Sequence, residues 1–316
     1  MKIFRSILEL NNCEPCVCAL GNFDGIHKGH QELINTAVRE AKQKGIKSAV
    51  FTFTDHPINV MSGHIVTKNI LSFNDKAMIL ENMGVDYLFT FNFEDYRLMS
   101  PEDFAQNLLS KDLKIKHAVC GFNYSFGYKA GGNHKDLIKF GQKYGFITTV
   151  IDPVQIDGLI VSSTLIRGCI EKGDFESYLS YTGRPYVIYG KVIEGEHNGR
   201  KMGFPTVNLN LDPSMALPAN GVYTTRTYID NKVYPSITNV GNKPTIGDFA
   251  KNAETHIFDF TENIYGKPLK VEFIFMQRFE KKFDDINSLA KQIEKDCVEA
   301  KNYHENHWFY AFCLLK

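Results

Sequence analysis

The sequence has no excess of either charge, since it contains 36 lysine and arginine residues and 36 aspartate and glutamate residues. A protein that binds nucleic acid along its surface normally carries a basic excess, so the composition argues against that partner. No apolar run approaches the roughly 18 residues needed to cross a bilayer, and the N-terminal segment lacks the small-residue cleavage site of a signal peptide. We therefore expect a cytoplasmic protein without a nucleic-acid or membrane partner.

Disulfide bonds are also not expected. The 7 cysteines are an odd number, and thiols stay reduced in the cytoplasm. Cys13 and Cys16 form a Cys-x-x-Cys pair with Cys18 nearby, but no second pair and no histidines at ligand spacing follow to complete a zinc site. Structural thiols are the favoured interpretation of this cluster, and redox or metal chemistry is the alternative.

What is present is a globular composition, with 43% hydrophobic and 23% charged residues, in a chain of 316 residues that favours two domains. Apolar runs at 16–23 and 48–53 flank a segment with helical spacing at 29–44, which is a β-α-β unit and predicts a parallel sheet. The alternation continues to residue 151 and predicts a doubly wound α/β domain. Its further helices are expected at 74–83, 101–109 and 135–144, and its further strands at 87–91, 117–120 and 146–151.

From about residue 186 the pattern changes to β-rich runs separated by glycine, proline and asparagine clusters. This spacing predicts a small antiparallel barrel or sandwich, followed by a helix at 286–298. We place the boundary near Gly183–Arg184, which gives domains of residues 1–183 and 184–316. The expected strands lie at 186–193, 221–229, 234–240, 254–260 and 269–275.

The first strand-to-helix junction carries Gly21-Asn-Phe-Asp-Gly-Ile-His27-Lys-Gly-His30. Open parallel sheets bind ligands at the carboxyl ends of their strands, and a helix N-terminus there offers N–H groups to a phosphate. Gly25 and Gly29 allow the backbone to approach closely, and two histidines three residues apart can face one anion. The motif resembles the His-x-Gly-His signature of the nucleotidylyltransferase superfamily, whose members join a nucleotide to a phosphate acceptor and release pyrophosphate.

Further segments resemble the flavin adenylyltransferases of that superfamily. Ser162-Ser163-Thr164-Leu-Ile-Arg167 is similar to their Ser-Ser-Thr-x-Ile-Arg motif, whose hydroxyls and helix N-terminus would hold a triphosphate. The segment 121–127 resembles their Gly-x-Asn-x-x-Phe-Gly loop, and 51–57 resembles the end of their second strand. In the segment 51–57, Thr54-Asp55 stands where that family more often has an acidic or apolar residue and then proline.

The resemblance implies in-line attack of an FMN phosphate on the α-phosphorus of ATP, which gives FAD and pyrophosphate without a covalent enzyme intermediate. Catalysis would rest on positioning and charge stabilisation by His27, His30, Arg167 and Mg²⁺. The residues implied in ATP binding are Gly21, Phe23, Asp24, Gly25, Gly29, Ser163 and Thr164. Those implied in flavin binding are His56, Asn123, Phe126 and Gly127.

The second domain opens with a glycine-punctuated loop that runs into Gly203-Phe-Pro205-Thr206-Val207-Asn208. It resembles the Gly-Phe-Pro-Thr-x-Asn motif of riboflavin kinases, in which alanine is usual at the position of Val207. The Thr206 hydroxyl and the Asn208 amide oxygen are hard neutral ligands suited to a Mg²⁺ that bridges ATP phosphates. The residues implied in ATP binding here are Gly195, Gly199, Gly203 and Pro205.

The segment that starts at Glu254 and His256 resembles the strand whose glutamate is the general base of riboflavin kinases. A carboxylate there can orient the ribityl 5′-hydroxyl of riboflavin and accept its proton. The segment 278–283 resembles the loop before the C-terminal helix that covers the flavin, which implies flavin contacts from Arg278 and Phe283.

Together these motifs resemble the bifunctional riboflavin kinase/FMN adenylyltransferase family over about residues 15–298. The resemblance implies an α/β chain with a Rossmann-like nucleotidylyltransferase domain, then a small antiparallel β-barrel with a C-terminal helix. Riboflavin, FMN, FAD and ATP would be its substrates and products. One alternative is an enzyme in which only one of the two sites is active. In that case the kinase is favoured, because Thr54-Asp55, which differs from the family pattern, lies in the N-terminal domain. A non-catalytic flavin-binding protein is a further alternative, but it would not need the catalytic side chains.

Overall fold

The computed structural model describes residues 1–194, 203–230, 232–242 and 251–313, and for 308–313 it describes the backbone only. The expected ATP contacts Gly195 and Gly199 lie outside the described residues. The chain divides into two compact units, residues 1–166 and 167–316, so this division falls before the boundary expected near Gly183–Arg184.

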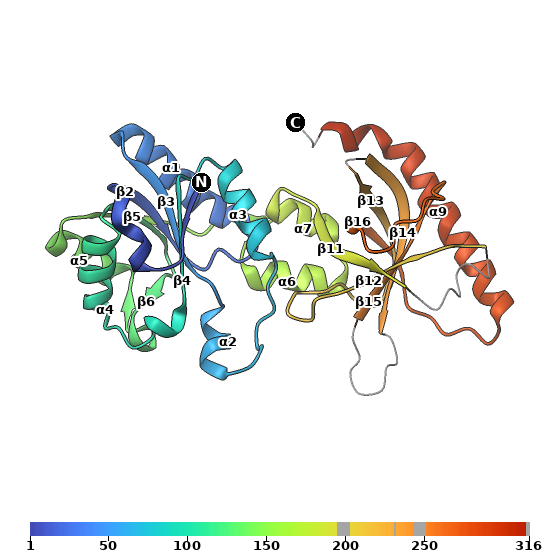
Figure 1. Ribbon diagram of the computed structural model, residues 1–316, viewed down its shortest axis with the longest axis horizontal. Helices are drawn as coiled ribbons and strands as arrows, with labels where there is room; N and C mark the ends of the chain where they lie inside the picture. The colour runs from blue at the N-terminus through green and yellow to red at the C-terminus, as the bar shows by residue number, and fades with distance from the viewer. Residues whose placement is uncertain (195–202, 231, 243–250, 314–316) are drawn as a thin grey trace. The chain divides into compact units, whose positions relative to one another are not determined.

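The first unit is built on a sheet that includes β2, β3, β4 and β5 (Figure 1). Its six strands follow the order β1-β4-β3-β2-β5-β8. Every neighbouring pair is parallel, which confirms the expected α/β class. The short first strand was not expected from the sequence. The strands are β1 (Lys2–Phe4), β2 (Cys16–Leu20), β3 (Lys47–Phe53), β4 (Tyr87–Phe91), β5 (Ile115–Gly121) and β8 (Ile147–Ile151).

Helices cover both faces of this sheet, and the inner strands β2 and β4 are buried along their whole length. In β2, Val17 and Ala19 pack with α1 (Lys28–Lys44) and α3 (Phe73–Asn82). The alternate residues Cys16, Cys18 and Leu20 pack on the other face, with η3 (Phe104–Asp112) and α5 (His134–Tyr144). The helix expected at 101–109 begins as α4 (Pro101–Asp103) and then widens into the π-helix η3.

Short elements complete the first unit and lead into the second. The helices and turns are η1 (Ile7–Asn12), α2 (Pro57–Ser62), η2 (Phe93–Asp95), η4 (Tyr128–Ala130), α6 (Ser163–Lys172) and α7 (Phe175–Thr182). The short strands form two hairpin pairs, β6 (Ser125–Phe126) with β7 (Gly132–Asn133), and β9 (Gln155–Ile156) with β10 (Leu159–Ile160).

The second unit contains a closed barrel in the order β11-β12-β15-β14-β13-β16, which decides between the expected barrel and sandwich. All its strand pairs are antiparallel. The strand β12 was not expected from the sequence. The strands are β11 (Tyr186–Ile193), β12 (Val207–Asn210), β13 (Gly221–Ile229), β14 (Lys232–Asn242), β15 (Lys251–Ile257) and β16 (Pro268–Phe279).

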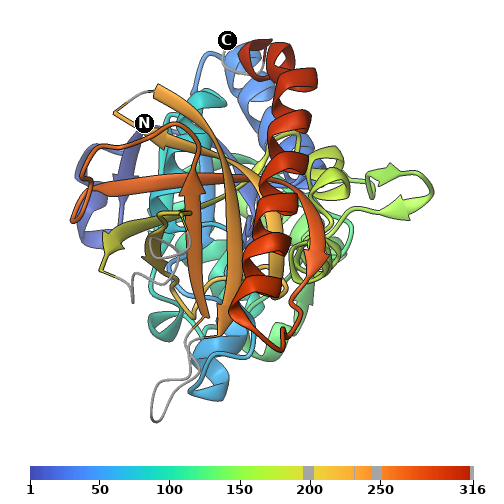
Figure 2. The ribbon, with the colours of Figure 1, turned by 90° about the vertical axis from the view of Figure 1, so that its right-hand side faces the viewer.

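Two helices pack on this barrel. The Phe175 ring of α7 stacks on Tyr186 of β11 with 5.1 Å between ring centroids, which ties α7 to the second unit. The C-terminal helix α9 (Ile286–Cys313) is longer than the expected 286–298 and lies across the strands (Figure 2). Cys297 and Ala300 of α9 bury an apolar cluster with Val222 and Ile237.

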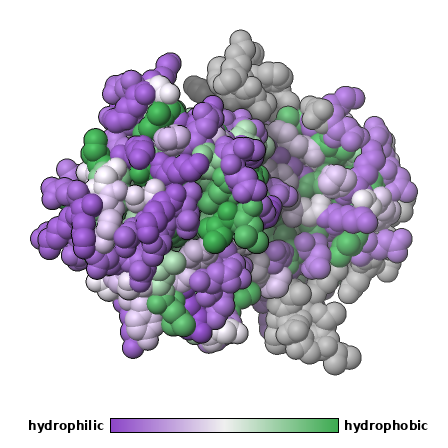
Figure 3. All heavy atoms as spheres, turned by 60° about the vertical axis from the view of Figure 1, so that its left-hand side comes forward, coloured by the Kyte–Doolittle hydropathy of each residue, from purple (hydrophilic) through white to green (hydrophobic). Residues whose placement is uncertain are grey.

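The surface is largely polar where the space-filling view shows it. On that face most of the described surface residues are hydrophilic, and the hydrophobic residues gather in separate patches (Figure 3). Exposed apolar side chains of the first unit include Ile58 and Met61 of α2 and Ile65 beyond it.

Candidate active sites

The sheet of the first unit has a topological switch point between β2 and β5. From β2 the chain proceeds through β3 to β4 on one side, whereas β5 pairs with β2 on its other side. Ligands of open α/β sheets bind outside the carboxyl ends of the strands at this point. The loops there are the expected ones, because Gly21–His30 follows β2 and Asn123 follows β5.

The turn after β2 has an unusual backbone. Phe23, Gly25 and Ile26 have φ angles of 48°, 82° and 34°, and such left-handed conformations cost about 1–3 kcal/mol each for residues other than glycine. Asp24, which is 5% exposed, accepts a hydrogen bond from the Ile70 amide at 2.9 Å. The structure therefore holds this strained turn in place from a neighbouring segment, as is typical of a preorganised ligand site.

Lys76 of α3 is a cation of this site that the motifs did not reveal. Its ammonium group donates to the Asn22 carbonyl at 3.1 Å. Burial lowers the pKa of Lys76, and the nearby carboxylate of Asp24 acts in the opposite direction. Its sequence signal was weak because a single lysine in an amphipathic helix normally lies in solvent.

The two motif histidines are held together at the start of α1. The Nδ1 atom of His27 accepts a hydrogen bond from the His30 amide at 3.3 Å, and the two rings stack with 3.7 Å between centroids. Because Nδ1 is the acceptor, the proton of a neutral His27 must be on Nε2, which makes Nε2–H a donor suited to an anion. The ring of His30 also packs against the ring of Phe23 in a T-shaped arrangement, with 5.2 Å between centroids.

The Ser-Ser-Thr motif reaches this turn from far along the chain. The hydroxyl of Ser163 donates to the Asp24 carbonyl at 2.7 Å across 139 residues of sequence. The hydroxyl of Ser162 accepts from the Leu165 amide at 3.3 Å and so caps α6, which also carries Thr164. The structure thus joins the two motifs in the first unit, while Arg167 follows on α6 in the second unit.

The expected flavin loop combines one exposed and two constrained residues. Asn123 is exposed, whereas Phe126 is buried and stacks on Tyr124 at 5.7 Å. Gly127 has a φ of 74°, and an added Cβ would lie 2.7 Å from the Pro101 nitrogen, so only glycine fits there. Their flavin contacts stay a prediction, as does that of His56, whose Nδ1 accepts from the Ile58 amide at 3.4 Å and caps α2.

In the second unit, strand register brings the expected metal ligand beside the expected base. Asn208 of β12 and Asn239 of β14 both pair with Glu254 of β15. The Nδ2 atom of Asn252 donates to Asn208 Oδ1 at 3.0 Å and to Glu254 Oε1 at 3.4 Å. Sequence reasoning missed Asn252, although it precedes Glu254 by two residues and therefore shares its face of the strand.

The Gly-Phe-Pro-Thr loop is anchored to the same strand by His256. Its Nδ1 lies 2.7 Å from the Pro205 carbonyl, and its ring meets Phe204 edge to face at 5.9 Å. A carbonyl only accepts, so His256 carries a proton on Nδ1. Burial lowers the pKa of His256, which favours the neutral ring. The peptide before Thr206 is thus tied to the strand of Glu254.

Arg278 joins β16 to α9. Its Nη2 atom lies 2.7 Å from Asp296 Oδ2, and its Nε donates to both oxygens of the same buried carboxylate. The guanidinium also lies 5.9 Å from the centroid of Phe283. These contacts bring the two expected flavin residues of this loop together, and their binding to flavin stays a prediction.

Known proteins match this chain in two parts. A model of the FAD synthetase family matches residues 10–165, and one of the riboflavin kinase family matches residues 182–304. A bifunctional riboflavin kinase/FMN adenylyltransferase of Bacillus subtilis is 35% identical over 296 residues, which cover 92% of this chain and 93% of that protein. One of Haemophilus influenzae is 31% identical, covering 96% and 99%.

The chain belongs to the bifunctional riboflavin kinase/FMN adenylyltransferase family. Because both family models match, the alternative of a single retained activity is not favoured. A crystal structure of a Streptococcus pneumoniae protein described as a macrolide-efflux protein is also similar, with a TM-score of 0.86, 29% identity and coverage of 95% and 98%. That description applies to the Streptococcus protein. In the described part of the present chain, no helix is long and apolar enough to span a bilayer.

The donor set beside Glu254 fits the Mg²⁺ that members of this family are expected to use with ATP. Among the described residues, no group of three histidine, cysteine, aspartate or glutamate side chains could hold a metal ion by itself. Asn208 Oδ1 accepts from Asn252 Nδ2 at 3.0 Å, which holds this hard oxygen at the position that pairs with Glu254. Mg²⁺ that is bound to a nucleotide takes most of its ligands from phosphate oxygens and waters, so few oxygens from the protein are enough to hold it.

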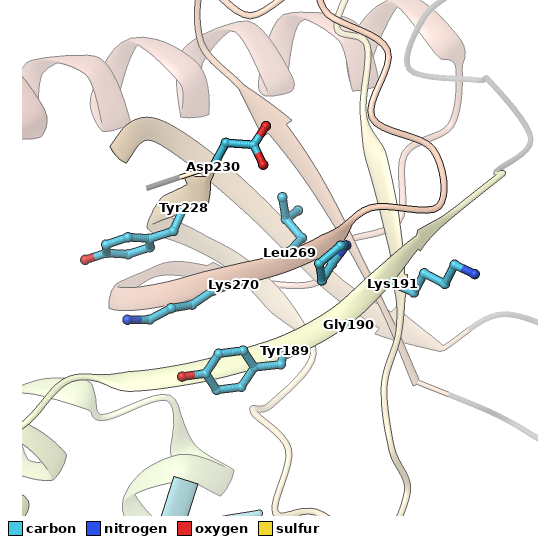
Figure 4. A pocket seen from close by; sticks show the side chains of 8 residues that line it. Tyr189, Gly190, Lys191, Tyr228, Asp230, Leu269 and Lys270 are labelled. Atoms are coloured by element: carbon cyan, nitrogen blue, oxygen red, sulfur yellow. The ribbon is translucent and has the colours of Figure 1, made fainter. Parts of the chain in front are cut away.

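A separate hollow of about 650 Å³ opens on the outer face of the barrel (Figure 4). Lys270 lies over the ring of Tyr228 at 4.2 Å, and the Tyr228 hydroxyl donates to Glu272. These groups satisfy one another, so the hollow is not a better candidate than the motif sites. Its lining is Tyr189, Gly190, Lys191, Tyr228, Asp230, Pro268, Leu269 and Lys270.

The Cys-x-x-Cys pair is buried, which argues for structural thiols. Burial raises the pKa of Cys13, Cys16 and Cys18, and all three are free cysteines. Since the thiolate is the reactive form, we expect iodoacetamide to label them at least about tenfold more slowly in the folded enzyme than in urea. Mass spectrometry of timed samples measures this, and rapid labelling of Cys13 or Cys16 in the folded enzyme would favour redox chemistry.

Proposed function

We propose that this chain phosphorylates riboflavin to FMN and then adenylylates FMN to FAD. The observation that carries this proposal is that each set of motif residues meets in one place, Ser163 with the Gly21–His30 turn and Asn208 with Glu254. We assign adenylyl transfer to residues 1–183 and phosphoryl transfer to residues 184–316. The free thiols of the described cysteines fit a reducing compartment, and we propose the cytoplasm.

In the adenylyl transfer, an oxygen of the FMN phosphate attacks the α-phosphorus of ATP and pyrophosphate leaves. The His27 Nε2–H, the His30 side chain and the N-terminal amides of α1 would donate to the phosphate oxygens and stabilise the charge of the transition state. Ser163 and Thr164 at the start of α6 would hold the triphosphate with Arg167. The stacking of the two histidine rings supports this role. Because the folded protein already holds both side chains in place, no further entropy is lost in ordering them when the substrates react.

In the phosphoryl transfer, Glu254 would accept the proton of the ribityl 5′-hydroxyl while that oxygen attacks the γ-phosphorus and ADP leaves. Thr206 and Asn208 would hold the Mg²⁺ of the nucleotide, which when bound neutralises charge on the phosphates. Asn252 supports the base assignment, since a hydrogen bond at 3.4 Å orients the carboxylate beside the metal ligand.

The decisive experiment incubates the purified full chain with riboflavin, ATP and Mg²⁺ and separates the flavins by chromatography. We expect FMN to accumulate first and FAD to follow. Formation of FMN alone, even when FMN is supplied as substrate, would contradict the adenylyl transfer and leave the kinase. Formation of FAD from FMN without conversion of riboflavin would contradict the kinase.

The hydrogen bond from His256 to Pro205 predicts an effect on nucleotide binding by the kinase. In His256→Asn the amide nitrogen takes the place of Nδ1, so we expect KM for Mg·ATP in riboflavin phosphorylation to change by less than about threefold. In His256→Phe the ring is retained and the donor is lost, which should raise this KM by about 3–10-fold, the usual worth of one neutral hydrogen bond. Equal losses in both variants would instead show that ring packing matters.

A further inference from the structure

Asn252 is a buried polar residue of the kinase site that no motif accounts for. Its side chain is 5% exposed and lies between two groups of assigned function. One amide nitrogen donates to Asn208 Oδ1 at 3.0 Å and to Glu254 Oε1 at 3.4 Å. Both acceptors are oxygens that the proposed reaction uses, one for the metal and one for the proton.

These neighbours determine which way the Asn252 amide is turned. The reverse orientation would place the Asn252 oxygen 3.4 Å from Glu254 Oε1, and an ionised carboxylate cannot donate, whichever way the Asn208 amide is turned. Asn252 Oδ1 must therefore point away from Asn208 and Glu254. Within the described part of the chain it is buried and has no hydrogen-bond partner. A buried acceptor that lacks a hydrogen bond lowers the stability of the folded protein. We therefore expect a donor to reach Asn252 Oδ1 when the ligand binds.

We propose that Asn252 is a positioning residue of the kinase site: its Nδ2 orients Asn208 and Glu254, and its Oδ1 accepts a hydrogen bond from a water bound to the Mg²⁺ of the nucleotide. The proposal rests on the proposed function, because Asn208 is there a ligand of that ion. A water is the fitting donor because Mg²⁺ sheds its waters reluctantly and keeps several of them in protein sites.

The test measures metal binding apart from turnover. Riboflavin fluorescence is followed in the full chain while Mg²⁺ is titrated at fixed ADP, and the Mg²⁺ concentration at half-saturation is determined. We expect Asn252→Ala to raise this concentration about tenfold. Asn210→Ala is the matched control, because Asn210 is the exposed strand partner of Asn252, and it should shift the concentration by less than twofold.

A double-mutant cycle with Asn208→Ala separates positioning from a general loss of stability. If Asn252 acts through Asn208 and its metal, adding Asn252→Ala to Asn208→Ala should raise the half-saturating Mg²⁺ by less than about twofold further. Additive losses, or a wild-type response in Asn252→Ala, would overturn the proposal. The amplitude of the riboflavin fluorescence change at saturating Mg²⁺ reports whether the second unit is folded in each variant. If wild-type protein showed no Mg²⁺-dependent response and formed no FMN from riboflavin, the proposed function itself would fail.

Discussion

Replacing Glu254 with glutamine is expected to lower kcat for riboflavin phosphorylation by about 10²–10⁴-fold, the usual worth of a general base, and to leave FMN adenylylation within about twofold of wild type. Glutamine keeps the size of the side chain and an oxygen that can accept from Asn252, so β15 and its pairing should be preserved. What it loses is the ability to take the proton of the ribityl 5′-hydroxyl. Initial rates of both reactions, measured on one preparation by chromatography of the flavins, test this.

Glu262→Gln is the matched control for this experiment, because Glu262 is an exposed glutamate that follows the same strand. It should leave both activities unchanged. If Glu254→Gln retained more than about a tenth of the wild-type kcat, Glu254 would not be the base. A parallel loss of both activities would instead indicate a folding defect.

Replacing His30 with alanine is expected to lower FMN adenylylation by about 10²–10³-fold, the usual worth of one donor to a developing oxyanion, while riboflavin phosphorylation persists. The substitution removes a ring that stacks on His27 at 3.7 Å. It preserves the backbone amide of residue 30, which donates to His27 Nδ1 and caps α1. The helix should therefore form normally, and the loss should report the chemistry of the imidazole.

The comparison variant is His64→Ala, because His64 is an exposed histidine of the first unit. Both variants are assayed for FAD formed from FMN and for FMN formed from riboflavin. Full FAD formation by His30→Ala would show that the phosphate site lies elsewhere. A loss in His64→Ala as large as that in His30→Ala would show that the effect is not specific to the motif.

Local patterns predicted most elements, because they depend on neighbours in sequence. The period of α1, the glycine after it and the buried strands β2 and β3 were all readable from side-chain spacing. Elements without a strong local signal were missed. The strand β1 has three residues and β12 has four, and each is specified by the strands it pairs with, β4 for the first and β11 and β15 for the second. The π-helical geometry of η3 likewise has no simple sequence signature.

The sequence by itself determined the chemistry, since the histidines, the Ser-Ser-Thr motif, Asn208 and Glu254 are recognisable as residue types at fixed spacing. Only the tertiary structure decided which of these groups meet and what supports them. Ser163 contacts the Asp24 carbonyl across 139 residues, and Asn252 joins Asn208 to Glu254 through strand pairing. His256 and Lys76 became site residues for the same reason. A hydrogen bond between distant segments depends on the packing of the whole unit, which leaves no periodic trace in the chain.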